Sequence, residues 1–334
     1  MSKEPKISVI VPVYGVEKYI ERCAISLFEQ TLDDIEYIFV NDCTPDCSIE
    51  ILKDVLDRYP NRESHVRILN MPRNSGQAAV RKLGIENATG EYIIHCDSDD
   101  WVELTAYEKM YKCAITNNSD IVFCDFFKSD GNTNTYISRP VNVQSKNLVI
   151  KSVSQKALWS LWGTLVKRTV IVNNKIIYPI NNNGEDFALM FQIMFYAERF
   201  YKLDEPLYFY YFNQNSITNC LTEEAYLKRL NQLKENTELV INFIKKHTNE
   251  VYFQKLIVCY KLFCRSKISP LTGHDKYKKI WKSVYPDLKF KDILLNNFIP
   301  LRSKLNYIAV KLNIYKIVCN SIRFIVIIAI SFRL

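Results

Sequence analysis

Residues 90 to 101 read Gly90-Glu91-Tyr92-Ile93-Ile94-His95-Cys96-Asp97-Ser98-Asp99-Asp100-Trp101. The apolar run is short enough for one buried strand, and it ends in three carboxylates within four positions. Carboxylates this close repel one another unless a cation or hydrogen-bond donors neutralise them. Mg²⁺ and Mn²⁺ prefer such oxygen ligands. The stretch therefore predicts a divalent metal site at the end of a strand; turn chemistry, with Asp100 capping a following helix, is the alternative.

Working outward, the first 125 residues alternate between strand-like and helix-like segments. The predicted strands are Ile7–Val13, Ile35–Val40, Val66–Leu69, Tyr92–Cys96 and Ile121–Cys124, and the predicted helices are Glu17–Gln30, Ser48–Tyr59, Gly76–Asn87 and Glu103–Asn117. Strands that are apolar on both faces and separated by helices indicate an α/β fold with a mostly parallel sheet and helices on both faces. Ligands of such sheets bind beyond the carboxyl ends of the strands.

The remainder of the chain is less regular and then mainly helical. Residues 128–139 suggest a loop or short hairpin, residues 154–162 and 185–196 suggest helices, and residues 201–211 suggest a hairpin around Glu205-Pro206. From Thr222 the pattern is helical, with breaks near Ser269-Pro270 and Pro286.

Charge is unevenly distributed along the chain, whose net charge is +8. Residues 251–334 carry 16 Lys/Arg and 3 Asp/Glu, whereas residues 1–250 carry 28 and 33. Near the end, apolar residues recur at helical spacing with cations between them: Leu301, Leu305, Ile308, Leu312 and Tyr315, with Arg302, Lys304, Lys311 and Lys316. This amphipathic pattern predicts a helix that lies on an anionic membrane surface; a terminal helix packed on the rest of the protein is the alternative.

Three further expectations concern the surroundings of the protein. The apolar run Phe324–Ile330 is far too short to span a bilayer, so we expect the chain to lie on the membrane rather than cross it. The basic residues are interleaved with long aliphatic runs, which disfavours nucleic acid as a partner. The ten cysteines form no CxxC pair, so we expect reduced thiols. No apolar signal-peptide core precedes the first strand, so we expect a cytoplasmic protein. With the basic amphipathic pattern near the end of the chain, we expect it to be peripheral on the inner face of the cell membrane.

Three loops at strand ends are expected to meet at one edge of the sheet. They span residues 12–17, 41–46 and 97–100. Such a convergence suits a nucleotide, because one acidic group can accept hydrogen bonds from the base or ribose and others can hold a metal at the diphosphate. We expect contacts to the nucleotide from Pro12, Tyr14, Glu17 and Ser98.

At this point the motifs resemble those of the family 2 glycosyltransferases, which have the GT-A fold. The resemblance rests on four segments in order: Ser8 to Tyr14, Val40 to Asp46, Asn74-Ser75-Gly76 leading to Arg81 and Gly84, and Asp97 to Trp101. Weaker matches are the Trp-centred segment 161–168, Gly184-Glu185-Asp186, and the aromatic and polar segment 210–218.

The resemblance implies roles for individual residues. Asp42 would read the base, Arg81 would lie near the base and diphosphate, Asp99 would bind Mn²⁺ or Mg²⁺ directly, and Asp97 would lie near the ribose and the metal waters. Asp186 would be the catalytic base, with Glu185 as its rival. It further implies a GT-A domain over residues 1–219, with a nucleotide-binding half (6–125) and an acceptor half (126–219), followed by a helical, basic region over 220–334.

The expected reaction is the transfer of a sugar, with inversion, from a nucleotide-diphosphate donor such as a UDP-sugar to a hydroxyl of a glycan or lipid-linked acceptor. A noncatalytic nucleotide-sugar-binding or scaffolding protein is the alternative. Phosphotransfer through an aspartyl nucleophile is disfavoured, because that pattern places its acidic pair after the first strand. A Rossmann oxidoreductase is disfavoured, because no GxGxxG follows the first strand.

Overall fold

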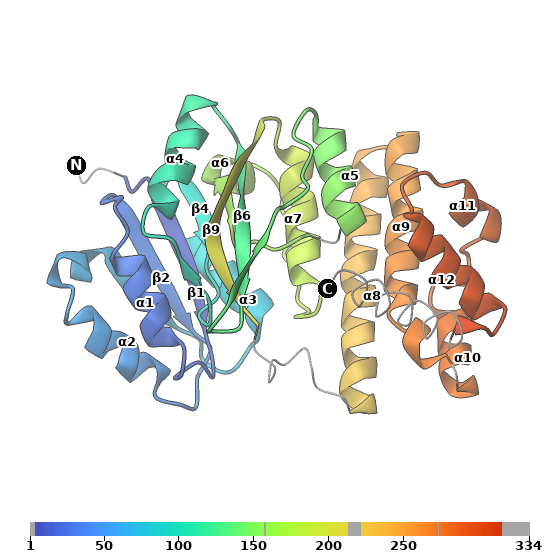
Figure 1. Cartoon of the computed structure of the whole chain (residues 1–334), viewed down its shortest axis with the longest axis horizontal. Coiled ribbons are helices and arrows are strands. Elements are labelled where there is room, and N and C mark those ends of the chain that lie inside the picture. The colour runs from blue at the N-terminus through green and yellow to red at the C-terminus, as the bar shows by residue number, and fades with distance from the viewer. Residues whose placement is uncertain (1–3, 157, 213–221, 273, 316–334) are drawn as a thin grey trace, which may run out of the picture. The chain divides into compact units, whose positions relative to one another are not determined.

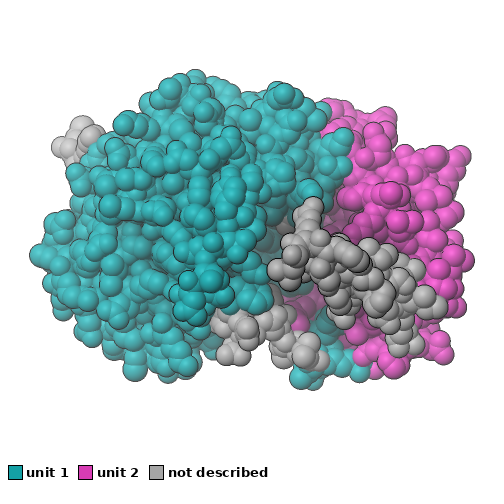
Figure 2. Space-filling view, viewed as in Figure 1, with its two compact units in different colours: residues 1–226 teal, residues 227–334 magenta. Residues whose placement is uncertain are grey.

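The structure is a computed structural model that describes residues 4–156, 158–212, 222–272 and 274–315. The chain forms two compact units, Met1–Tyr226 and Leu227–Leu334, which are coloured separately in Figure 2. The first unit contains the sheet and the second is helical (Figure 1).

The first half of the sheet is parallel, as the sequence predicts. Strands β1 (Ile7–Val13), β2 (Ile35–Asn41), β3 (Val66–Asn70) and β4 (Tyr92–His95) lie in the order β3-β2-β1-β4. Val9 of β1 pairs with Tyr37 of β2 and with Ile94 of β4. All four carboxyl ends therefore face one edge of the sheet.

The second half of the sheet is mixed rather than parallel. It continues as β8-β6-β9-β5, with strands β5 (Trp101–Val102), β6 (Ile121–Ser129), β7 (Asn134–Ile137), β8 (Thr164–Lys167) and β9 (Phe200–Tyr211). Strand β8 is antiparallel to both β4 and β6, whereas β9 is parallel to β6. Strand β7 completes a hairpin with β6, which is one of the two forms expected for residues 128–139.

Two local predictions are wrong. The hairpin expected around Glu205-Pro206 is a continuous strand, β9, and the turn-like residues form a bulge: Cys124 of β6 pairs with Leu203, and Asp125 pairs with Pro206. A bulge tolerates a proline because its backbone position lies outside the regular hydrogen-bond ladder. The helix expected over residues 154–162 is α5 (Lys146–Lys156), which lies earlier in the chain, and Leu158–Ser160 are not helical.

Helices cover both faces of the sheet, as expected (Figure 1). Helices α1 (Ile20–Phe28), α2 (Ser48–Leu56) and α4 (Ala106–Thr116) share one apolar core with Val9 and Val11 of β1. On the other face, helix α3 (Gln77–Asn87) packs so closely that a Cβ on Gly84 would lie 2.4 Å from the Ile10 side chain. The remaining helical segments of this unit are η1 (Pro60–His65), α6 (Arg168–Val172) and α7 (Glu185–Tyr196).

The second unit consists of helices, as predicted. These are α8 (Glu223–His247), whose first residues belong to the first unit, α9 (Val251–Ser266), η3 (Ser269–Leu271), α10 (Asp275–Ser283), α11 (Phe290–Leu295) and α12 (Leu301–Lys311). Buried Arg265 fixes the break near Pro286, because its guanidinium donates to the carbonyls of Val284 and Tyr285. Among the residues described, no helix is both long and apolar enough to cross a membrane. Phe324–Ile330 and Lys316 lie outside the described residues.

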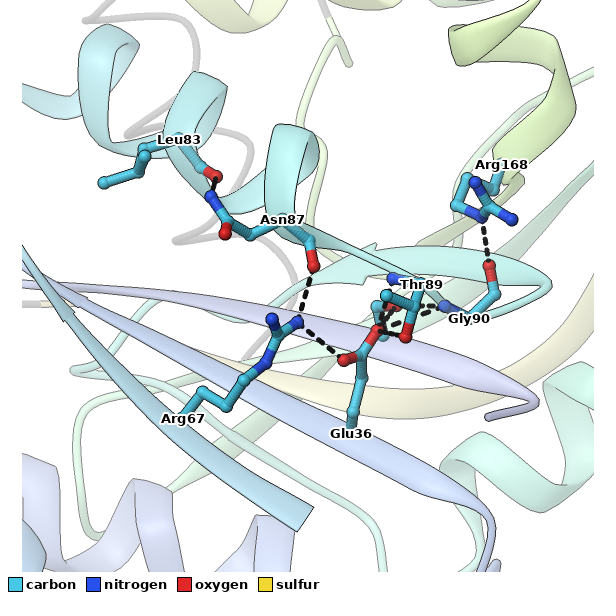
Figure 3. Close-up of polar contacts among 8 residues, drawn as sticks. Glu36, Arg67, Leu83, Asn87, Thr89, Gly90 and Arg168 are labelled. Carbon is cyan, nitrogen blue, oxygen red and sulfur yellow. Dashed lines mark hydrogen bonds and ion pairs between the residues drawn. The ribbon is translucent and has the colours of Figure 1, made fainter. Parts of the chain in front are cut away.

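At the opposite edge of the sheet from the converging loops, the buried carboxylate of Glu36 joins several segments (Figure 3). It accepts hydrogen bonds from the Ser8 hydroxyl of β1, from the backbone and side chain of Thr89, and from the Gly90 backbone. Its other oxygen pairs with Arg67 of β3 at 2.7 Å. Burial alone would raise the pKa of Glu36, but the hydrogen bonds from Ser8 and Thr89 and the charge of Arg67 lower it below its ordinary value.

We predict that Glu36→Ala lowers the free energy of unfolding by about 3–5 kcal/mol, because it leaves buried donors and Arg67 without their acceptor. Exposed Glu50→Ala on α2 is the control and should cost less than about 1 kcal/mol. Since the folded-state pKa of Glu36 is lowered, its contribution is complete above the unfolded-state pKa of about 4.3 and disappears as the pH falls through the folded-state value. Urea titrations at several pH values measure both effects, and a loss that does not change at acid pH contradicts the assignment.

Candidate active site

The loops after β1 and β2 are joined at the carboxyl edge of the sheet. Three backbone amides of the first loop donate to side chains of the second loop and of the first residue of α2: Gly15 to Thr44 (2.9 Å), Glu17 to Asp46 (3.0 Å) and Val16 to Ser48 (3.1 Å). Gly15 has a φ of +67°, which favours glycine. Tyr14 is 44% exposed, the Glu17 side chain is exposed, and Pro12 is a half-buried strand residue. The structure thus places Tyr14 and Glu17 on an open rim of this edge.

Asp42 is the buried residue that directly follows β2, and its side chain holds the start of α3. Its two carboxylate oxygens accept the backbone N–H groups of Ser75 (2.7 Å) and Gly76 (2.8 Å). Gly76 has a φ of +83°, and a Cβ there would overlap the Asn182 side chain. Asn182 in turn accepts the Ala78 backbone N–H at 3.1 Å. The segment before α7 is therefore joined to the start of α3, beside Asp42.

Arg81 connects the acidic stretch after β4 with the acidic pair of α7. Its guanidinium donates to Asp97 at 2.9 Å and to Glu185 at 2.8 Å, and the residue is only 4% exposed. Burial disfavours the charged form, but the carboxylates of Asp97, Glu185 and Asp186 outweigh this effect and raise the pKa of Arg81. Three residues from distant parts of the sequence are thus brought together, all of them among the predicted site residues.

The three carboxylates after β4 have different surroundings. Asp97 pairs with Arg81, while burial and the charge of Asp97 raise the pKa of Asp99 to about 6. Asp100 is buried and accepts hydrogen bonds from the Tyr208 hydroxyl (2.5 Å) and the Tyr211 backbone (2.7 Å). The helix cap considered for Asp100 is therefore wrong, because this carboxylate instead binds β9. Ser98, which lies between Asp97 and Asp99 in the sequence, is buried.

The side chains of Asp97 and Asp99 are suitable ligands for a divalent cation, because Mg²⁺ and Mn²⁺ prefer carboxylate oxygens. The raised pKa of Asp99 reflects a half-buried negative charge beside Asp97, which a cation would stabilise. Within the described part of the chain, no group of three or more His, Cys, Asp and Glu side chains could hold a metal by itself. Mg²⁺ is commonly held by one or two carboxylates together with water and substrate phosphates, so two protein ligands are sufficient.

The two acids at the start of α7 differ in what their carboxylates contact. Gly184, with a φ of +81°, precedes the helix, and the buried Glu185 carboxylate is paired with Arg81. Burial raises the pKa of Glu185 to about 7, against the opposing charge of Arg81. Asp186 is half-buried, accepts the Phe187 backbone N–H at 2.7 Å, and has a pKa raised by burial. Asp186 is thus the more accessible of the two.

Several supporting residues were not predicted from the sequence. The Tyr208 hydroxyl also accepts the Asp97 backbone N–H at 3.1 Å, so one tyrosine of β9 contacts both ends of the acidic stretch. Arg22 of α1 donates to the Asp99 carbonyl at 2.8 Å and stacks 3.7 Å from the Trp101 ring centroid. The aromatic run Tyr208–Tyr211 was visible in the sequence, but its pairing with the acidic stretch depends on the strand order.

Trp162 and His95 lie beside this network. Trp162 was considered as part of a helix; instead, its indole stacks on Tyr208 with ring centroids 4.7 Å apart. The buried Nδ1 of His95, in strand β4, has no hydrogen-bond partner. Burial, with a contribution from Arg81, lowers the pKa of His95 well below its ordinary value, so the ring is neutral. Residues 213–218 of the aromatic and polar segment lie outside the described residues.

Comparison with known proteins identifies the class to which this fold and site belong. The model of glycosyl transferase family 2 matches residues 8–196, more than half of the chain, so the chain belongs to glycosyl transferase family 2 and is a glycosyltransferase. It is 35% identical over 224 residues to the glycosyltransferase EpsJ of Bacillus subtilis, a match that covers 64% of this chain and 63% of EpsJ.

Solved structures share the GT-A fold. Residues 1–349 of S. aureus TarS, solved with UDP-GlcNAc, match with a TM-score of 0.58 and 16% identity, covering 91% of this chain and 90% of that one. The mannosyltransferase PcManGT of Pyrobaculum calidifontis, solved with GDP-Man and Mn²⁺, matches with a TM-score of 0.56 and 13% identity, covering 94% and 88%. These matches confirm the predicted fold class.

We predict that Arg81→Met lowers the free energy of unfolding by about 3–5 kcal/mol, because it leaves Asp97 and Glu185 without their buried counterion. The neighbouring exposed Lys82→Met is the matched control and should cost less than about 1 kcal/mol. In a Glu185→Gln background the Arg81→Met loss should be smaller, since one of the two stranded charges is already gone. Equal losses in the two backgrounds, measured by denaturant titration, are incompatible with this pairing.

Proposed function

We propose that this glycosyltransferase transfers a sugar, with inversion, from a UDP-sugar to a hydroxyl of a glycan or lipid-linked acceptor, with the help of Mn²⁺ or Mg²⁺. The observation that carries the proposal is the Arg81 link, which brings Asp97, next to Asp99, and Glu185, next to Asp186, to one edge of the sheet. The UDP-GlcNAc in TarS and the Mn²⁺ in PcManGT support a nucleotide-sugar donor and a divalent ion.

On the donor side, the protein would bind and orient the nucleotide at the edge formed by the three loops. Asp42 is assigned to the base and Tyr14, Glu17, Pro12 and Ser98 to the nucleotide. Asp42 already accepts two backbone amides, and this fixes the orientation of its carboxylate. Asp99 and Asp97 would hold the cation, which when bound supplies positive charge to the leaving diphosphate.

Arg81 contributes mainly by position in this proposal. Both ends of its guanidinium are committed to carboxylates, so it places positive charge beneath the donor site and keeps the base-bearing helix at the correct place. The family resemblance implies that Arg81 lies near the base and diphosphate. In this proposal Arg81 would affect them through its charge rather than through direct hydrogen bonds.

On the acceptor side, Asp186 is assigned as the general base. A base must reach the acceptor hydroxyl directly or through one water. Glu185 is less suitable because its carboxylate is occupied by Arg81, whereas Asp186 is half-buried and its raised pKa makes it a better proton acceptor once ionised. Proton removal by Asp186 would accompany in-line attack of the hydroxyl oxygen on the anomeric carbon, which inverts the configuration at that carbon.

The location proposed for the reaction is the cytoplasmic face of the cell membrane, with the protein peripheral to it. A lipid-linked acceptor would be presented there, and the basic residues of the last third of the chain would favour an anionic surface.

We predict that Asp186→Asn lowers the transfer rate by about 10²–10⁴-fold and leaves donor affinity near that of the wild type, since base catalysis acts on the acceptor. Calorimetry with a UDP-sugar and Mn²⁺ measures the affinity, and product formation measures the rate. Glu185→Gln serves as the comparison: it should lower the free energy of unfolding, because Arg81 loses a partner. If Asp186→Asn keeps full activity while Glu185→Gln is stable but inactive, Glu185 rather than Asp186 is the base.

We predict that Asp99→Asn removes metal-dependent nucleotide binding and transfer without destabilising the metal-free protein, because the substitution removes a half-buried charge beside Asp97. Exposed Asp54→Asn on α2 is the matched control and should behave as the wild type. Mn²⁺-dependent affinity for UDP, measured by calorimetry, and thermal unfolding without metal are the two readouts. Undiminished Mn²⁺-dependent affinity in Asp99→Asn would refute the metal assignment.

A further inference from the structure

Exposed apolar side chains are concentrated at the end of the second unit. Of the sixteen large apolar side chains that are exposed among the described residues, seven lie within residues 290–314. We call these seven the leucine face: Phe290, Leu294, Leu295, Leu301, Leu305, Leu312 and Ile314. Single exposed apolar residues are ordinary on protein surfaces, but a cluster of this size indicates an interaction site.

Helix α12 is apolar on two sides, and only one of them is packed. Tyr307 and Val310 are buried, and the Tyr307 ring lies 5.2 Å from that of Trp281 in α10. Leu301, Leu305 and the adjoining Leu312 are 71%, 51% and 62% exposed. At about 100° per residue these three side chains lie within about 40° of one another around the helix. Packing within the unit therefore explains the first side of the helix and leaves the leucines without a function in the fold.

Helices α11 and α12 are in contact with each other. The Lys304 ammonium of α12 donates to the Leu294 carbonyl of α11 at 2.7 Å. At the other end, Lys311 lies 4.8 Å from the Phe290 ring centroid, and the rings of Phe290 and Tyr307 are 6.3 Å apart. Helix α11 therefore lies beside the Lys304 and Lys311 flank of α12, next to the exposed leucines of that helix.

Positive charge surrounds the leucine face. Residues 289–312 contain five basic residues, Lys289, Lys291, Arg302, Lys304 and Lys311, and a single acid, Asp292. Around the axis of α12, Arg302 lies on one flank of the leucines, and Lys304 and Lys311 lie on the other. An apolar stripe bordered by cations on both sides matches the acyl chains and the anionic headgroups of a bilayer surface.

We propose that the leucine face is a docking surface for an anionic membrane, with the leucines at the level of the headgroup and acyl-chain boundary. A second copy of the chain suits this face less well, because a symmetric contact would place equal positive charges against each other. The inference deepens the membrane-surface location in the proposed function and rests on it, but membrane binding can be measured independently of sugar transfer.

Vesicle co-sedimentation of the full chain tests the proposal, with vesicles of phosphatidylcholine alone or with phosphatidylglycerol. The wild type should bind the anionic vesicles and release from them at high salt. The triple variant Leu301→Gln, Leu305→Gln, Leu312→Gln should bind at least roughly tenfold more weakly, because it removes apolar contact area. The triple variant Arg302→Gln, Lys304→Gln, Lys311→Gln should lose about fivefold per cation, or roughly a hundredfold.

Matched variants in exposed positions elsewhere provide the controls. Ile115→Gln, Val172→Gln, Val251→Gln removes equally exposed apolar groups, and Lys53→Gln, Lys112→Gln, Lys175→Gln removes the same charge. Both should bind much more like the wild type than their counterparts do. Equal binding by a control and its counterpart overturns the proposal, as does absence of wild-type binding to anionic vesicles.

Three other arrangements give different results. If Ile325→Gln, Ile328→Gln abolishes binding while the leucine variant binds fully, the later segment is the membrane element and the proposal fails. The proposal also fails if the wild type does not bind vesicles but forms a dimer in sedimentation velocity, or retains a protein from a lysate, and the leucine variant does neither. Sugar transfer to a soluble acceptor by the leucine variant would show that catalysis does not depend on membrane docking. If the wild type transfers no sugar, the catalytic proposal fails and the docking proposal is unaffected.

Discussion

The candidate site depends on one buried cation, the guanidinium of Arg81. Helix α3 presents it between a carboxylate at the end of β4 and another at the start of α7, two segments separated by almost ninety residues. Burial favours the neutral form of Glu185, and the charge of Arg81 opposes this effect. The ion pairs therefore hold the acidic stretch after β4 and the start of α7 together, and any movement of α3 changes both.

Around this cation, three neighbouring carboxylates have three different environments. Asp97 is paired with Arg81, Asp100 is held by Tyr208 and Tyr211 of β9, and Asp99 remains as a half-buried charge that the protein compensates least. The cluster is thus partly structural and partly available to a ligand. Because Tyr208 also contacts the Asp97 backbone, the mixed second half of the sheet sets the geometry of the acidic stretch that follows the parallel half.

Local pattern and motif order were sufficient for the parallel strands, the helices between them and the acids at the sheet edge. The strand β9 was not recognisable because the signal of Glu205-Pro206 is the same for a turn and for a bulge, and only the partner strand β6 distinguishes the two. In the same way, the sequence identified Arg81 and Glu185 separately but could not show that they are paired, since that contact depends on how α3 and α7 pack. The roles of Asp100 and Tyr208 depend on the same long-range pairing.

Helix α12 shows how one periodic pattern can satisfy two requirements. The sequence left open whether the apolar residues after Pro300 pack on protein or face a membrane, because periodicity does not identify the partner. In the structure the helix packs through Tyr307 and Val310, and the leucines at 301, 305 and 312 are exposed on a different side. Exposed leucines add nothing to the stability of the folded unit and increase its tendency to associate. Their concentration on one cation-bordered face is therefore better explained by a partner than by folding.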